Sequence, residues 1–230
     1  MTFIITKGYQ RSNSDAEYSK LLAEFGVATV SEAQDKKGVM NTEIKPIQTG
    51  RSVAGRAVTV ECTAADNLMI HAALEFCKPG DVLVVSTPKE AKNGFFGELM
   101  ATSAMKRGVA ALIIDGGVRD SQAMRDMNFP VWSRYVYVIG TSKKNPGNVN
   151  LQISCSDVKV NPGDYVVADD DGVVVVAKEN IDVVLEKSGT RVEKEKVTRD
   201  KLQKGELSMD FYGLRKVIED LKIEYRESGT

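Results

Sequence analysis

Two short segments of the chain combine residue types that could bind and polarise an oxyanion. The first, Asn93-Gly94-Phe95-Phe96-Gly97-Glu98-Leu99-Met100, places two glycines directly before a helix expected from about Leu99. A helix N-terminus presents unpaired backbone N–H groups and a partial positive charge, and glycine lets a ligand approach the backbone closely. The segment therefore indicates a carboxylate site, although glycines before a helix more often serve only the turn.

The second segment is Asp115-Gly116-Gly117-Val118-Arg119-Asp120, which follows an apolar run from Val109 to Ile114. We expect the run to be a buried strand, and loops at the carboxyl ends of strands are the usual ligand sites of α/β sheets. Arg119 offers a planar, permanently charged fork that suits an oxyanion, and Asp120 is a hard oxygen ligand of the kind that Mg²⁺ prefers. The alternative is a surface ion pair, with Asp120 capping a helix that begins at Ser121.

The elements that must position these residues follow from the apolar pattern. Spacing at i, i+3, i+4 and i+7 predicts helices around Tyr18–Phe25, Met69–Phe76, Ala101–Gly108, Ile181–Ser188 and Leu214–Leu221. Short β-branched runs predict strands at Ala57–Val60, Val82–Val85, Ala111–Ile114, Val131–Trp132 and Val173–Val176. Helices and strands alternate along the chain, which predicts an α/β fold.

Turn residues define further boundaries. Pro79-Gly80-Asp81 and Pro162-Gly163-Asp164 each precede an apolar run and predict a turn that leads into a buried strand. Asp169-Asp170-Asp171-Gly172 indicates the turn of a hairpin, with a metal site as the less favoured alternative. We expect one domain over residues 1–230, with a C-terminal helical arm at about 180–225. The charged stretch at 190–206 is a solvated helix face or an arm that reaches a neighbouring subunit.

Composition excludes several classes of protein. The 31 basic and 32 acidic residues give a net charge of −1, so no long-range field collects polyanions, and nucleic acid is not the expected ligand. Cys62, Cys77 and Cys155 form no CxxC pair, which favours buried thiols in a reducing compartment. No apolar run is long enough for a signal peptide or a membrane span. We therefore expect a cytoplasmic protein.

The combination of Gly97-Glu98, twenty further residues and Arg119-Asp120 resembles the acidic-x20-Arg-Asp signature of the class II pyruvate aldolases. These include 4-hydroxy-4-methyl-2-oxoglutarate / 4-carboxy-4-hydroxy-2-oxoadipate aldolase of aromatic catabolism, and they share a fold with the regulator of ribonuclease E activity A. The likeness covers roughly residues 20–222. It also rests on Thr29-Val30-Ser31-Glu32-Ala33, Asp66-Asn67 with His71, Gly94-Phe95-Phe96-Gly97, Phe129-Pro130-Val131-Trp132-Ser133 and Val167-Ala168-Asp169-Asp170-Asp171-Gly172-Val173.

The resemblance implies a role for each residue of the signature. Asp120 would be the protein ligand of Mg²⁺ or Mn²⁺, and Arg119 would contact the keto or enolate oxygen of the substrate. The amides of Gly97, Glu98, Leu99 and Met100 would bind the pyruvyl carboxylate. Glu98 stands where the protocatechuate-pathway aldolases carry Asp, and it would orient a catalytic water. An acidic residue from a neighbouring subunit would complete the site, and Glu195 or Glu193 is the match.

The resemblance further implies a fold, an assembly and a reaction. The fold would be an α/β sandwich of the swivelling, phosphohistidine-domain type, assembled as homotrimers or homohexamers with a C-terminal interface helix from Asp210 onward. The enzyme would cleave 4-hydroxy-2-oxo di- or tricarboxylic acids to pyruvate and a 2-oxo acid, and it would decarboxylate oxaloacetate through the same pyruvate enolate. The alternative is a non-catalytic, protein-binding regulator of a ribonuclease or helicase on the same fold.

Other catalytic residue types are less suited to the chemistry. His71 is the only histidine, so a multi-histidine metal site is excluded. We expect it to be a partly buried structural histidine, with a place near the site as the alternative. Lys89, Lys92 and Lys106 lie in polar surroundings or at a helix end, which disfavours a Schiff-base mechanism.

Overall fold

The computed structural model describes residues 2–226. Within these residues the chain divides into two compact units, with the boundary between Ser188 and Gly189. The prediction of one domain over residues 1–230 with a helical arm stays a prediction. The first unit contains every strand found in the described part of the chain and both segments with candidate chemistry.

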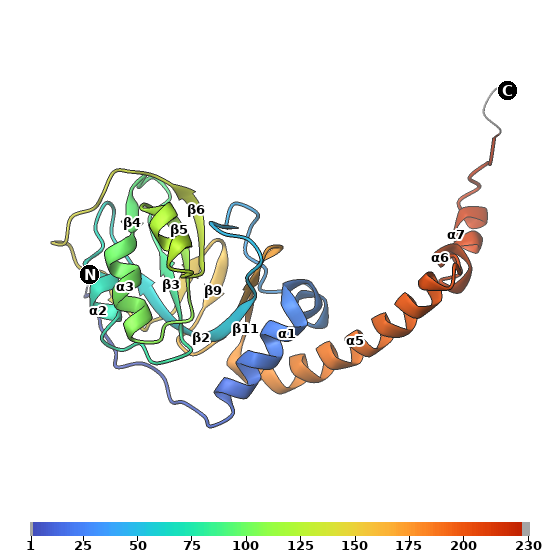
Figure 1. Ribbon diagram of the computed structural model, residues 1–230, viewed down its shortest axis with the longest axis horizontal. Coiled ribbons are helices and arrows are strands. Elements are labelled where there is room, and N and C mark those ends of the chain that lie inside the picture. The colour runs from blue at the N-terminus through green and yellow to red at the C-terminus, as the bar shows by residue number, and fades with distance from the viewer. Residues whose placement is uncertain (1, 227–230) are drawn as a thin grey trace. The chain divides into compact units, whose positions relative to one another are not determined.

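The first unit is built on a sheet whose strands follow the order β1-β6-β5-β3-β2-β10-β11, with β4 beside β5 and β7 beside β2 (Figure 1). Strands β2, β3, β5 and β6 run parallel, and β10 and β11 form an antiparallel hairpin. The strands span Lys45–Pro46 (β1), Val53–Glu61 (β2), Val82–Ser86 (β3), Gly94–Phe96 (β4), Ala111–Val118 (β5), Val131–Val136 (β6), Asn148–Val149 (β7), Tyr165–Asp169 (β10) and Gly172–Val176 (β11). A separate hairpin joins β8 (Ile153–Cys155) to β9 (Val158–Val160).

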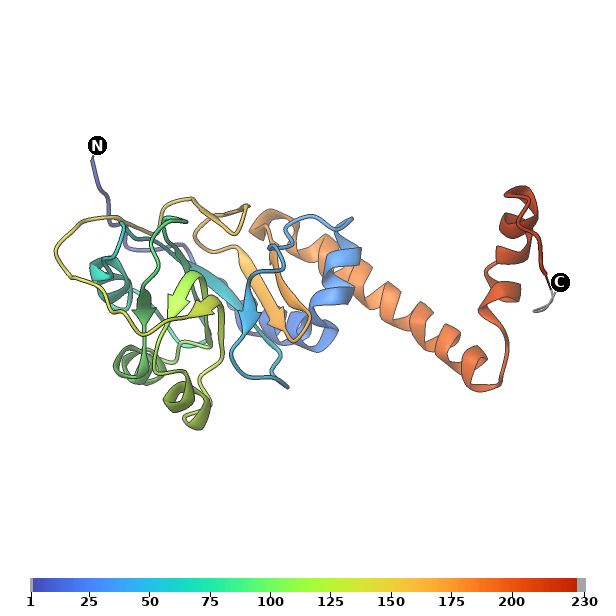
Figure 2. The same ribbon diagram turned by 90° about the horizontal axis from the view of Figure 1, so that it is seen from above.

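The parallel strands are apolar along nearly their whole length because layers cover both faces of the sheet. One face packs against α2 (Leu68–Ala73), α3 (Glu98–Lys106) and α4 (Ser121–Asp126), of which α3 and α4 lie side by side in Figures 1 and 2. The β8–β9 hairpin covers the other face together with Met40 and Ile44. The helix α1 (Asp15–Ala33) and the start of α5 (Ile181–Gln203) pack against β10 and β11. These layers confirm the predicted α/β fold.

The turns and the hairpin agree with their sequence patterns. Gly80 and Gly163 adopt φ values of 87° and 84°, which glycine tolerates without strain, and Asp81 and Asp164 follow them as buried acceptors. In the hairpin, Asp169 pairs with Gly172 across β10 and β11. The carboxylate of Asp169 accepts the amide of Asp171 at 2.9 Å, the local bond by which an aspartate stabilises a turn.

Three expectations about local structure are wrong. Residues 94–96 form strand β4 beside β5 rather than part of a turn, and β5 continues to Val118 rather than ending before Asp115. The expected helix from Asp210 onward is two helices, α6 (Ser208–Phe211) and α7 (Leu214–Asp220). Gly213 separates them with a φ of 68°, a left-handed conformation that ends a helix.

Two composition-based expectations concern cysteines and membranes. Cys62, Cys77 and Cys155 are buried free thiols, as predicted, and burial raises the pKa of each. Over residues 2–226, no helix has both the length and the apolar content that a bilayer crossing requires.

Candidate functional site

Strands β4 and β5 bring the two candidate segments together. The amide of Arg119 donates to the carbonyl oxygen of Phe96 at 2.8 Å, and the amide of Tyr137 donates to that of Val118 at 2.8 Å. Arg119 and Asp120 therefore leave the carboxyl end of β5 between β4 and the end of β6. Helix α3 begins at Glu98, directly after β4, so its N-terminus lies beside the same strand end.

A cavity of about 310 Å³ opens at this place. Every predicted site residue of the first unit lines this cavity. Its thirteen lining residues are Asn67, His71, Gly94, Phe95, Phe96, Gly97, Glu98, Leu99, Met100, Arg119, Asp120, Thr141 and Lys143. The residues predicted from sequence in the first unit thus line one cavity at the carboxyl edge of the parallel strands, where α/β sheets commonly bind ligands.

Asp120 has an unusual backbone and an unexpected partner. Its φ of 54° and ψ of 34° are left-handed, which costs a non-glycine residue about 1 kcal/mol or more. Asp120 occupies the N-cap position of α4, but its carboxylate does not cap that helix. The carboxylate oxygen Oδ2 instead accepts the amide of Glu98 at 3.2 Å. The alternative in which Asp120 caps the helix from Ser121 is therefore wrong, and the strained backbone directs the carboxylate to the start of α3.

Arg119 and Asp120 are only loosely paired. Arg119 Nε lies 3.7 Å from Asp120 Oδ2, and the two side chains are 49% and 46% exposed. An exposed pair at this distance contributes little to stability, so both charges remain available to a ligand. Glycines make room for them: a Cβ at Gly97 would overlap Asp120 Oδ2, and a Cβ at Gly140 would lie 2.8 Å from Arg119 Nη1.

Some backbone amides at the start of α3 already donate hydrogen bonds within the protein. Gly97 is extended, and its carbonyl oxygen accepts the amide of Met100 at 3.1 Å. The amide of Glu98 donates to Asp120. The predicted set of four carboxylate-binding amides is therefore not presented together: a bound carboxylate would compete with Asp120 for Glu98, and the amide of Met100 turns back into the helix. The Leu99 side chain is 79% exposed.

His71 lies on α2 and lines the cavity, so the alternative placement near the site is correct. The residue is exposed rather than partly buried. Desolvation of the ring, and then the positive charge of Lys143, lower the pKa of His71 below its usual value.

The cavity also contains residues that the sequence analysis did not single out as functional. Asn67 Nδ2 donates to the carbonyl oxygen of Phe95 at 2.8 Å, while Asn67 Oδ1 is buried without a hydrogen-bond partner. A buried acceptor of this kind can be satisfied by a donor on a ligand or by water. Thr141 and Lys143 come from a polar loop after β6. Loop residues of this kind carry no periodic signal, and only the Asp66-Asn67 pair was noted, as part of the family likeness.

The donor set limits which metal the site could hold. Across the described part of the chain, no cluster of three or more His, Cys, Asp and Glu side chains could enclose an ion. Asp120 is a single, half-exposed carboxylate. That arrangement fits a hydrated hard cation such as Mg²⁺, which keeps several waters and takes further ligands from a substrate. It does not fit a structural zinc site.

The predicted acidic residues from a neighbouring subunit lie in the second unit. Glu193 and Glu195 are on α5. Glu195 forms an ion pair with Arg191, which lies one helical turn before it, and the distance from Arg191 Nε to the carboxylate is 2.8 Å. Their contribution to a neighbour's site stays a prediction.

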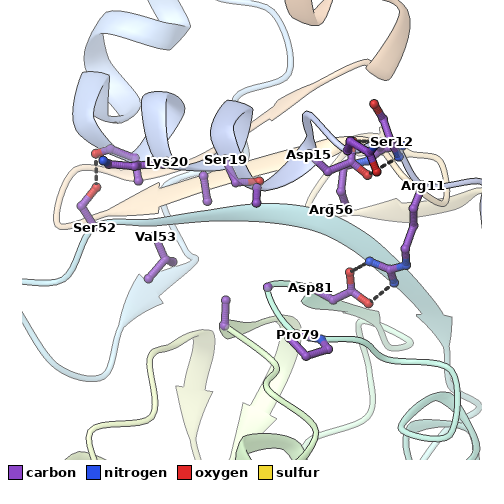
Figure 3. Close-up of a pocket in the computed structure, with 16 residues that line it drawn as sticks. Arg11, Ser12, Asp15, Ser19, Lys20, Ser52, Val53, Arg56, Pro79 and Asp81 are labelled. Atoms are coloured by element: carbon purple, nitrogen blue, oxygen red, sulfur yellow. Dashed lines mark hydrogen bonds and ion pairs between the residues drawn. The ribbon is translucent and has the colours of Figure 1, made fainter.

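Two other polar regions could be mistaken for the functional site. A larger cavity of about 500 Å³ is lined by Arg11, Asp15, Arg56 and Asp81 (Figure 3). Arg11 donates two hydrogen bonds to Asp81, at 2.8 and 2.6 Å, and Arg56 is paired with Asp15. These ion pairs already occupy both guanidinium groups of the cavity.

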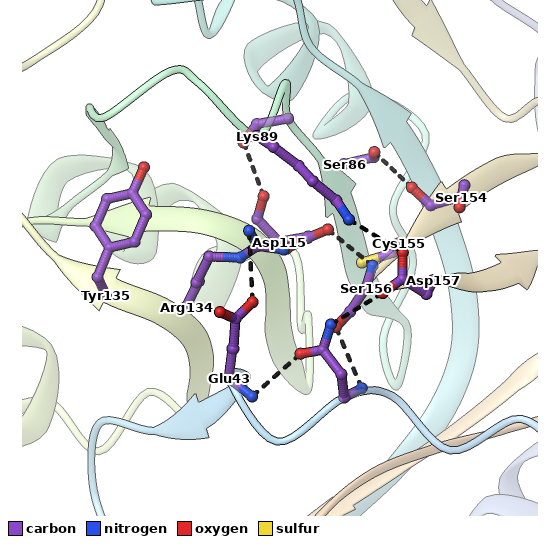
Figure 4. A network of polar contacts seen from close by, with 12 residues as sticks. Glu43, Ser86, Lys89, Asp115, Arg134, Tyr135, Ser154, Cys155, Ser156 and Asp157 are labelled. Atoms are coloured by element: carbon purple, nitrogen blue, oxygen red, sulfur yellow. Dashed lines mark hydrogen bonds and ion pairs between the residues drawn. The ribbon is translucent and has the colours of Figure 1, made fainter.

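The second region lies under β5. Asp115 accepts the amide of Ser156 at 2.8 Å and is paired with Arg134, which also lies 3.6 Å from Glu43 (Figure 4). Asp115 is buried, and its carboxylate connects β5 to the β8–β9 turn. The network therefore fixes the layer beneath the sheet.

Comparison with known proteins relates the chain to a family. A model of the RraA-like family, described as Aldolase/RraA, matches residues 27–175. A protein of Halalkalibacterium halodurans named "Putative 4-hydroxy-4-methyl-2-oxoglutarate aldolase" is 29% identical over 210 residues, which cover 91% of this chain and 98% of that protein. A protein of the same name from Pseudomonas putida KT2440 is 32% identical over 55% of this chain and 77% of its own.

A solved structure supports the fold as well. RraAS2 of Streptomyces coelicolor, described as an unusual member of the RNase ES inhibitor RraA protein family, superposes with a TM-score of 0.75 and 26% identity. The match covers 83% of this chain and 98% of that chain. The family match includes Glu98, Arg119 and Asp120 but ends before Glu193 and Glu195.

Proposed function

We propose, on the premise that the chain belongs to the RraA-like (Aldolase/RraA) family, that it is a divalent-metal-dependent lyase. Its substrates are 4-hydroxy-2-oxo di- and tricarboxylic acids, which it cleaves to pyruvate and a second 2-oxo acid. The observation that carries the proposal is the loose, half-exposed pair of Arg119 and Asp120 beside the N-terminus of α3. Both charges are held in position by glycine-rich backbone, and neither is consumed by a strong internal partner.

The proposed reaction must stabilise negative charge on the enolate oxygen of the pyruvyl group. The Arg119 guanidinium lines the cavity and would donate hydrogen bonds to that oxygen as the charge develops. A divalent ion held by Asp120 would supply Lewis-acid stabilisation of the same charge. The N-terminus of α3 favours the substrate carboxylate, which would take the place of Asp120 at the Glu98 amide.

Proton transfer requires a base for the C4 hydroxyl group. Glu98 is exposed at the cavity, so its carboxylate can orient a water that accepts this proton and later returns it to the enolate. Decarboxylation of oxaloacetate leaves the same enolate without needing the base. The proposed site therefore supports both reactions, with Mg²⁺ or Mn²⁺ as the ion.

The proposal includes an assembly. In a homotrimer or homohexamer, Glu195 or Glu193 would complete the site of a neighbouring subunit. A fully active monomer in sedimentation at the assay concentration would contradict this part.

A regulator of RNA processing is the second candidate, because the Streptomyces relative is described as belonging to an RNase ES inhibitor family. A binding protein has no need for a cavity with loosely paired, half-exposed charges at a strand end. We therefore rank it below the lyase.

Pyruvate release distinguishes the two candidates. The purified protein is incubated with oxaloacetate and a panel of 4-hydroxy-2-oxo acids, with Mg²⁺ or Mn²⁺ and with excess chelator. We expect pyruvate only when the metal is present. No pyruvate from any substrate would contradict the lyase, and turnover in chelator with borohydride trapping on a lysine would contradict the metal mechanism.

A further inference from the structure

Another cavity of the first unit, of about 380 Å³, lies where the end of α1, the turn after β9 and the start of α5 meet. Three lysines line it, and each comes from a different segment: Lys37 follows α1, Lys159 lies on β9 and Lys187 lies on α5. All three residues are exposed. Every residue that lines the cavity precedes Gly189, so the cavity belongs to the first unit alone. The fold therefore gathers three positive charges that are far apart in the sequence.

The three lysines of this cavity form no ion pair within the described part of the chain, unlike several lysines elsewhere. Lys36, the neighbour of Lys37 in the sequence, lies 3.7 Å from Glu32. Two aspartates also line the cavity, and only one of them, Asp35, is exposed. The other, Asp164, is buried. Three exposed lysines thus face one exposed carboxylate, which leaves the cavity with an excess of positive charge.

The buried aspartate holds the walls together. One carboxylate oxygen of Asp164 accepts the backbone amide of Asn161 at 2.8 Å and its side-chain amide at 3.3 Å. The other oxygen accepts the amide of Lys178 at 3.2 Å. Hydrogen bonds therefore already compensate the charge of Asp164, and they fix the turn after β9 to the segment that leads into α5.

The wall formed by the end of α1 is fixed as well. Gln34 Nε2 donates to the carbonyl oxygen of Val175 on β11 at 2.9 Å, and the amide of Val175 donates to the carbonyl oxygen of Gly38 at 2.8 Å. Gly38 has a φ of 70°, and a Cβ at this position would overlap the Val175 carbonyl oxygen. The backbone around the lysines is therefore held in place before any ligand binds, which lowers the entropic cost of binding.

We infer that this cavity binds a small phosphate-bearing anion between Lys37, Lys159 and Lys187. An ammonium group acts as a point charge and suits a phosphate group, whereas a planar carboxylate is best matched by the paired donors of arginine. No arginine is among the described residues that line the cavity. Val158 and Val183 also line it and offer apolar contact to the remainder of the ligand. The cavity shares no lining residue with the candidate active site, so the inference is independent of the proposed lyase function.

The test is a calorimetric titration with inorganic pyrophosphate as the probe, at low ionic strength and without divalent metal. Citrate is titrated in parallel, because it carries a similar charge on planar carboxylates. The titrations use the wild-type protein and the variants Lys37→Gln, Lys159→Gln and Lys187→Gln, singly and combined. We expect one pyrophosphate to bind per chain, and more tightly than citrate.

Each single substitution should weaken pyrophosphate binding about threefold to fivefold, the scale of one exposed ion pair. The combined variant should weaken it roughly thirtyfold or more. A second triple variant, Lys20→Gln, Lys36→Gln and Lys89→Gln, is the matched control: it loses the same net charge, but each of these lysines is paired with a carboxylate and lies outside the cavity. This control should bind pyrophosphate within about twofold of the wild-type protein, because distant exposed charges are largely screened.

Four results would overturn the inference. Absence of pyrophosphate binding would remove the site, and equal losses in the two triple variants would show that only net charge matters. Citrate binding as tight as that of pyrophosphate would contradict the phosphate class. Loss of pyrophosphate binding in Arg119→Ala, with the three lysines intact, would place the anion at the candidate active site instead. Unchanged melting temperatures, expected for exposed lysines, confirm that the variants are folded.

Discussion

Arginine–aspartate pairs line two cavities of this protein, and the pairs differ in how fully their hydrogen-bonding groups are used. Arg11 donates twice to Asp81, which is fully buried and also accepts the hydroxyl of Tyr9 at 2.7 Å. Arg119 lies 3.7 Å from Asp120, and both are about half exposed. In the larger cavity the ion pair therefore fixes the N-terminal segment to the Pro-Gly-Asp turn. In the smaller cavity the two charges are loosely paired and half exposed, as the proposed function requires.

The difference follows from the backbone around each pair. Asp81 sits in a Pro-Gly-Asp turn whose Lys78 amide also donates to the carboxylate, at 2.7 Å. Asp120 sits in a left-handed conformation that turns it away from its own helix and toward the start of α3. The contacts around Asp81 stabilise the fold, whereas Asp120 keeps a strained backbone conformation, as is common at functional sites.

The largest expected effect that separates the two regions is in Asp120→Asn. The carboxylate is half exposed and accepts the Glu98 amide, which Asn can also do, so unfolding free energy should change by less than about 1 kcal/mol. Activity should fall by roughly a thousandfold, or about 4 kcal/mol, if Asp120 holds the metal. Steady-state kinetics and thermal unfolding of the same sample test this. A large loss of stability with activity retained would reverse the assignment.

The next effect is expected for Asp81→Ala, which should lower stability and leave activity unchanged. Loss of the carboxylate leaves the Arg11 guanidinium and the partly buried Tyr9 hydroxyl without their partner, which should cost about 3 kcal/mol. Solvent reaches Arg11, which is 36% exposed, and this keeps the cost at the low end of the range. Urea unfolding measures the loss, and kcat of the folded fraction should stay near the wild-type value. A selective loss of kcat would indicate that the larger cavity has a catalytic role.

A smaller effect concerns pH and Asp66. Burial by itself raises the pKa of Asp66. The hydrogen bonds from Lys144, Ser142, Leu68 and Asn145 together outweigh this effect and bring the pKa down to about 2. In the unfolded chain the pKa of Asp66 is near 3.8, so the unfolded state binds a proton more readily than the folded state does. The resulting stability, on the order of 2 kcal/mol, is fully present above about pH 5 and is lost as the pH falls toward 2.

Urea unfolding at pH 7, 4 and 3 tests this dependence. Asp66→Asn should be less stable than wild-type protein at pH 7, and the gap should shrink as the pH falls. Parallel curves for the two proteins would contradict the contribution of the Asp66 carboxylate.

Sequence patterns predicted the parts of the site that regular elements position. Arg119 and Asp120 follow a long apolar run, and Glu98 begins a helix with a clear apolar stripe, so their neighbourhood at one strand end could be inferred. Strand β4 was missed because it has only three residues, Gly94, Phe95 and Phe96. A run this short has no measurable alternation, and it forms a strand because β5 lies beside it.

Loop geometry could not be predicted in the same way. Lys143 reaches the cavity because Asp66, far away in sequence, accepts hydrogen bonds from the residues around it. The carboxylate of Asp120 turns away from the helix that it precedes because its φ is positive, which residue type alone does not specify. Both features depend on tertiary contacts that have no local sequence signal.

The central claim is that Arg119 stabilises the enolate, and kinetics of Arg119→Ala test it most directly. The enolate oxygen gains charge in the transition state, so kcat and kcat/KM should fall together by about 10² to 10³, the 3 to 4 kcal/mol expected for one preorganised donor. Arg119→Lys should recover only part of this, because an ammonium lacks the planar pair of donors. The melting temperature should stay unchanged, because the side chain is 49% exposed. A folded alanine variant that keeps its kcat and raises only KM would show that Arg119 merely anchors the substrate.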